Sequence, residues 1–78
     1  MKKMNLTVPA LVTPQWVQAQ VNKIEGMSQD PEGAHIRADC LYLEVLRAIA
    51  QGRCGRHTRA CAEITLKADE LDFPRWSA

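Results

Sequence analysis

The chain has 78 residues, with ten lysines and arginines against nine aspartates and glutamates, and its net charge is +1. This length leaves no room for a second hydrophobic core, so we expect one domain over residues 1–78. A charge so close to zero does not commit the whole surface to nucleic acid or to a membrane. Hydrophobic residues make up 46% of the chain, which argues for a folded domain over a disordered one.

The N-terminal segment, residues 1–13, is predicted to be an extended arm. Pro9 and Pro14 disfavour a helix before Thr13, because each pushes the residue before it toward extended geometry. The apolar residues of this segment would let it lie across the body of the domain. A short edge strand is the alternative, although no partner strand is evident.

The first helix is predicted over residues 14–26. Thr13 is a suitable cap, and Pro14 is tolerated at the first helical position. Val17, Val21 and Ile24 then recur at i, i+4 and i+7, the spacing of one apolar helix face. We expect this face to be buried.

The second helix is predicted over residues 31–51, with Asp30 as its cap and Gly52 as its left-handed terminator. Apolar residues surround most of its circumference, with Leu41 on one face and Leu43 on another. A helix of this kind is expected to be buried on most sides. It would therefore form the centre of the domain or of a homo-oligomer.

The third helix is predicted over residues 58–71, with Thr58 as its cap and an outward-facing ion pair between Glu63 and Lys67. Its apolar stripe is formed by Cys61, Ile64, Ala68 and Leu71. The C-terminal tail carries Phe73 and Trp76, which we expect to pack back onto the helices. The predicted fold is thus all-α: a small three-helix domain with an extended N-terminal arm and an aromatic C-terminal tail.

The connector between the second and third helices is the most unusual segment of the chain. No acidic residue occurs between Glu44 and Glu63, whereas several cations do. Arginine side chains suit carboxylates and phosphates alike. The candidate contact surface for an anionic partner consists of Arg53, Arg56, His57 and Arg59.

Cysteine and histidine chemistry offers an alternative for the same region. Cys40, Cys54, Cys61 and His57 complete a Cys3His set of zinc ligands. However, Cys40 and Cys61 fall on apolar helix stripes, where cysteine commonly acts as a small hydrophobe. Cys54 would then remain on the exposed turn, where neighbouring arginines favour a thiolate. No third group that would orient His57 is evident, so we predict no enzyme activity, no metal site and no cofactor.

Nucleic-acid binding through residues 53–59 is the second alternative, because a helix, a turn containing glycine and another helix resemble a helix-turn-helix. The third helix would then present Glu63, Asp69 and Glu70 to the phosphates, and these side chains have the wrong sign.

The function expected from the sequence is that of a small non-enzymatic protein–protein interaction or regulatory module, with a protein partner or a second copy of itself. Three cysteines at irregular spacing do not form a secreted disulfide framework. No segment of the chain is long and apolar enough to span a membrane. We therefore expect a cytoplasmic protein that makes no membrane contact.

Overall fold

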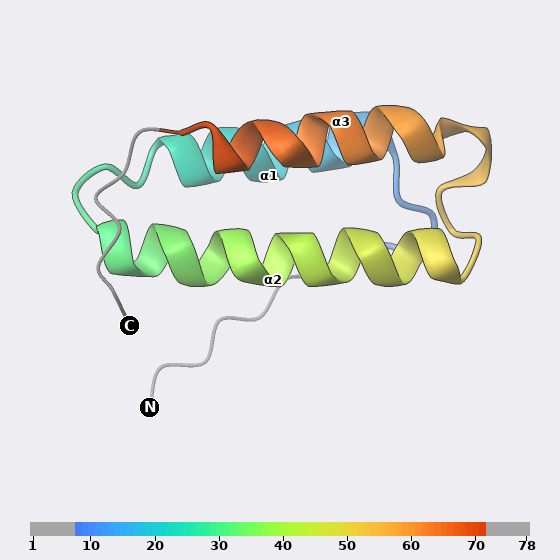
Figure 1. Cartoon of the computed structure of the whole chain (residues 1–78), viewed down its shortest axis with the longest axis horizontal. Coiled ribbons are helices and arrows are strands. Elements are labelled where there is room, and N and C mark those ends of the chain that lie inside the picture. The colour runs from blue at the N-terminus through green and yellow to red at the C-terminus, as the bar shows by residue number, and fades with distance from the viewer. Residues whose placement is uncertain (1–7, 72–78) are drawn as a thin grey trace.

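The structure, a computed structural model, describes residues 8–71 and contains no strand within that range. Its elements are α1 (Pro14–Glu25), α2 (Pro31–Ala50), a short 3-10 helix η1 (Gly55–His57) and α3 (Thr58–Asp69). Each of the three α-helices packs against the other two, and α2 lies opposite α1 and α3 in Figure 1. The predicted all-α, three-helix fold is confirmed. The predicted aromatic C-terminal tail lies outside the described residues.

The first two helices begin where the sequence predicts. The Thr13 hydroxyl accepts a hydrogen bond from the backbone N–H of Trp16 at 3.1 Å. The Asp30 carboxylate accepts one from Gly33 at 3.0 Å. Each cap satisfies a backbone donor that the first turn of a helix leaves free, which stabilises the helix by about 1 kcal/mol.

Gly52 terminates α2 as predicted, and α3 begins at residue 58 as predicted but ends at Asp69, two residues before the predicted end. Gly52 adopts a φ of +72°, and the N–H of Arg53 then reaches back to the Ala48 carbonyl at 2.8 Å, as in a Schellman motif. The predicted cap role of Thr58 is wrong. Thr58 is already the first residue of α3, because η1 leads directly into the helix, and its hydroxyl donates back to the Gly55 carbonyl at 3.2 Å.

The hydrophobic core lies between the three helices and extends to the end of the arm. Val17, Val21 and Ile24 of α1 are all buried, as their spacing predicts. The other buried apolar residues are Val12, Ala34, Ala38, Leu41, Val45, Ala48, Cys54, Cys61 and Ala68. Small side chains dominate this list, so the helices can approach one another closely.

The prediction that α2 is buried on most sides is wrong for the single chain. Leu41 is fully buried, but Leu43 is 52% exposed and Leu46 is 66% exposed. In a bundle of three helices, α2 meets its two neighbours with one side only, and the opposite side faces solvent. Leu43 belongs to that outer side. Helix α2 is therefore one wall of the domain and not its centre.

Candidate functional site

The inner side of the connector is part of the core. Cys54 is 1% exposed and Cys61 is completely buried. The expectation that Cys54 remains on the exposed turn is therefore wrong. Glycines with positive φ stand on either side of Cys54, at Gly52 (+72°) and Gly55 (+57°). Glycine adopts such positive φ values readily because it lacks a Cβ. The two glycines allow the connector to change direction on either side of Cys54, whose side chain is buried in the core.

The N-terminal arm is hydrogen-bonded to this connector. The N–H of Val12 donates to the Arg53 carbonyl at 2.9 Å, and the Cys61 thiol lies 3.8 Å from the Val12 carbonyl. Val12 itself is 1% exposed. The described end of the arm thus lies across the body of the domain, and Val12 contacts both the connector and α3.

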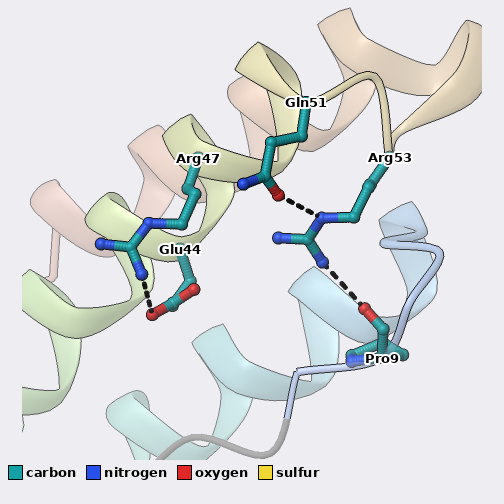
Figure 2. Close-up of polar contacts among 5 residues, drawn as sticks. All are labelled: Pro9, Glu44, Arg47, Gln51 and Arg53. Atoms are coloured by element: carbon teal, nitrogen blue, oxygen red, sulfur yellow. Dashed lines mark hydrogen bonds and ion pairs between the residues drawn. The ribbon is translucent and has the colours of Figure 1, made fainter.

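Arg53 strengthens the same contact from the solvent side. Its Nη1 donates to the Pro9 carbonyl at 3.1 Å, and its Nε donates to the Gln51 side chain at 2.8 Å (Figure 2). The structure thus separates Arg53 from the other three residues of the candidate surface, because its guanidinium is occupied by oxygens of its own chain. Arg53 holds the arm against the connector.

The remaining three candidate residues form what we call the basic connector surface: Arg56, His57 and Arg59. All three are exposed. Neither Arg56 nor His57 makes a side-chain hydrogen bond or ion pair within residues 8–71. Arg59 Nε lies 3.5 Å from Glu63 Oε2, but the Arg59 side chain is 91% exposed, and such a surface pair contributes at most about 1 kcal/mol.

The acidic partner that the sequence predicts for Lys67 is thus taken by Arg59. Glu63 could face either residue, since both are four positions away. The structure pairs it with Arg59, at the N-terminal end of α3. That end has no acidic residue in its first turn and no side-chain cap, so a positive helix terminus adds to the positive charge of the basic connector surface.

The four candidate zinc ligands do not come together among the described residues. Within residues 8–71, no three side chains of histidine, cysteine, aspartate or glutamate come together as a metal-binding group. Cys40 is half-buried on α2, whereas His57 is exposed on η1. Burial, together with the neighbouring Cys54, raises the pKa of the Cys61 thiol to about 11. Cys61 therefore stays protonated at neutral pH, which does not suit a nucleophile.

A second surface feature is an apolar groove between α2 and α3, with a volume of about 270 Å³. It is lined by Tyr42, Val45, Leu46, Ile49, Ala62, Thr65 and Leu66. Leu46 and Leu66 are 66% and 63% exposed. Sequence reasoning missed this groove because it assumed that α2 was covered. The available signal was Leu66, which lies off the apolar stripe that begins at Cys61.

A comparison of the chain with protein-family models, curated proteins and solved structures finds no match. Among the described residues, no helix combines the length and the apolar character needed to cross a lipid bilayer.

Proposed function

We propose that the protein is a small, non-enzymatic interaction module of the cytoplasm, which binds an acidic segment of a partner protein through the basic connector surface. The observation that carries this proposal is the contrast between the two sides of the connector. Its inner side is held by Cys54, Cys61 and Val12, while Arg56 and His57 project into solvent without partners in the described chain.

Rigid support of this kind favours binding, because less conformational entropy is lost when a partner docks on a fixed backbone. Arg53 contributes by tying the connector to Pro9 and Gln51. The arginine side chains then supply the planar donors that carboxylates accept in pairs. An acidic segment would also meet the positive N-terminal end of α3.

A protein partner is preferred over nucleic acid because the outer side of α3 is mixed in charge. Glu63, Lys67 and Glu70 are all exposed there, so a long polyanion lying along the helix would meet carboxylates. A short acidic segment can bind the connector alone. The three cysteines, none of which is in a disulfide, agree with the reducing cytoplasmic setting.

Binding of a fluorescent glutamate-rich peptide, measured by anisotropy at low and high salt, tests the proposal. Arg56→Gln should weaken binding about two- to fivefold, since one exposed charge contact is worth a few tenths to 1 kcal/mol. Arg47→Gln is the matched control, because Arg47 is also exposed and already pairs with Glu44 at 3.4 Å on α2 (Figure 2). Equal loss in both variants would contradict the connector as the site. Tighter binding of a duplex DNA of the same charge would favour the nucleic-acid alternative.

A further inference from the structure

The apolar groove between α2 and α3 is walled by the outer side chains Leu46 and Leu66, each about two-thirds exposed. Two exposed leucines facing one groove of a domain this small make an apolar patch of the kind that marks an interaction site. The hydrogen bond between the Arg53 side chain and the Pro9 carbonyl does not contribute to this patch.

We propose that this groove joins two copies of the chain across a two-fold axis, with each α3 lying antiparallel to the α3 of the other copy. The argument for a second copy comes from the charges on either side of the groove. Arg59 precedes the groove on α3, and Glu70 follows it. Both are exposed, and successive steps of about 100° place them on the same side of the helix as Leu66.

The positions of these charges match the centre of the groove. Residues 59 and 70 lie at nearly equal distances from the segment that lines it, Ala62 to Leu66. With a rise of about 1.5 Å per residue, each charge is about 8 Å from the midpoint. A two-fold axis there brings Arg59 of one copy opposite Glu70 of the other, and the reverse. Leu66 of each copy then lies about 2 Å along the helix from the axis, opposite Glu63 of the other copy. An isologous contact of this kind is self-complementary, whereas a parallel arrangement would bring Arg59 against Arg59.

This inference goes beyond the proposed function. It shares Arg59 with the basic connector surface but uses neither Arg56 nor His57. A failed peptide-binding test therefore leaves it standing, and a failed dimer test leaves the peptide site standing. Burial of Leu46 and Leu66 would also remove the two most exposed large apolar side chains of the described chain from water, which supplies the driving force.

Sedimentation equilibrium of the full chain over a wide concentration range tests the proposal. We expect a monomer–dimer equilibrium that Leu46→Glu and Leu66→Glu each shift toward the monomer by at least tenfold, with circular dichroism to show that the helices are kept. Leu11→Glu is the matched control, because Leu11 is 60% exposed on the arm and does not line the groove. A monomer at every concentration would overturn the proposal, as would a dimer that is equally sensitive to Leu11→Glu.

Charge reversal tests the antiparallel register. Arg59→Glu and Glu70→Arg should each weaken the dimer about two- to tenfold, since each substitution is felt at two symmetric contacts. The double variant should recover most of the original affinity. A double variant weaker than both single variants would rule out this register. If Leu66→Glu instead leaves a constant monomer but changes its tryptophan fluorescence, the groove is occupied by a tryptophan-bearing part of its own chain, and the dimer is wrong.

Discussion

Two leucines two positions apart on α2 should differ sharply in their contribution to stability. Leu41 is fully buried, whereas Leu43 is 52% exposed. Leu41→Ala removes apolar atoms from the centre of the core and leaves a cavity there, at a cost of about 2–5 kcal/mol. Leu43→Ala gives up only part of its burial, and water fills the space, so we expect a cost of about 1 kcal/mol.

The size of this difference matters because the whole domain is small. A core of this size is expected to supply roughly 3–5 kcal/mol of net stability. Leu41→Ala would consume most of that margin and leave a substantial unfolded population at room temperature. Leu43→Ala would lower the melting temperature by about 4–8 °C.

Urea denaturation followed by circular dichroism measures both costs. Each variant should be measured at two protein concentrations, because a dimer through the groove would make the stability of both variants depend on concentration. Equal free-energy losses for the two variants would refute the placement of α2 as a wall of the bundle. A larger loss for Leu43→Ala would mean that the helix is rotated from the orientation described.

Two further substitutions probe the connector. Burial and the neighbouring Cys54 raise the pKa of the Cys61 thiol from 9.0 to about 11 in the folded chain, so its stabilising contribution is intact below pH 9 and about 2–3 kcal/mol is lost as the pH rises to 11. The melting temperature should therefore fall more steeply across this pH range for the natural chain than for Cys61→Ala, and parallel curves would contradict this. Arg53→Ala should lower the free energy of unfolding in urea by about 1 kcal/mol, because it removes the hydrogen bonds to Pro9 and Gln51. The control Arg47→Ala removes only an exposed ion pair with Glu44 and should cost less than about 0.5 kcal/mol; the opposite order would show that the Arg53 hydrogen bonds do not stabilise the fold.

The helices themselves could be predicted because their signals are local. Thr13-Pro14 and Asp30-Pro31 combine a capping side chain with a proline at the first helical position, and Gly52 provides the left-handed end of α2. The orientation of α2 could not be predicted in the same way. Leu41 and Leu43 are chemically identical, and only the positions of α1 and α3 decide which of them is covered.

The candidate site divides in a similar manner. Arg56, His57 and Arg59 are exposed as the sequence suggests, because charged residues on a turn have no reason to be buried. The position of Arg53 depends instead on a segment more than 40 positions away, the arm that contains Val12 and Pro9. No local sequence pattern predicts a contact between residues so far apart in the chain. The groove escaped prediction for the same reason, since it exists only once α2 and α3 are side by side.

The hydrogen bond between Val12 and Arg53 has a consequence for how the chain can acquire its structure during synthesis. Val12 is among the first described residues to be made, but the Arg53 carbonyl and the Cys61 thiol that hold it are made more than 40 residues later. The arm must therefore wait, unpartnered, while α1 and α2 emerge. Closing so long a loop costs conformational entropy, and this cost is offset only by the contacts of the assembled bundle. The contact between the arm and the connector consequently forms only after Arg53 and Cys61 have been made.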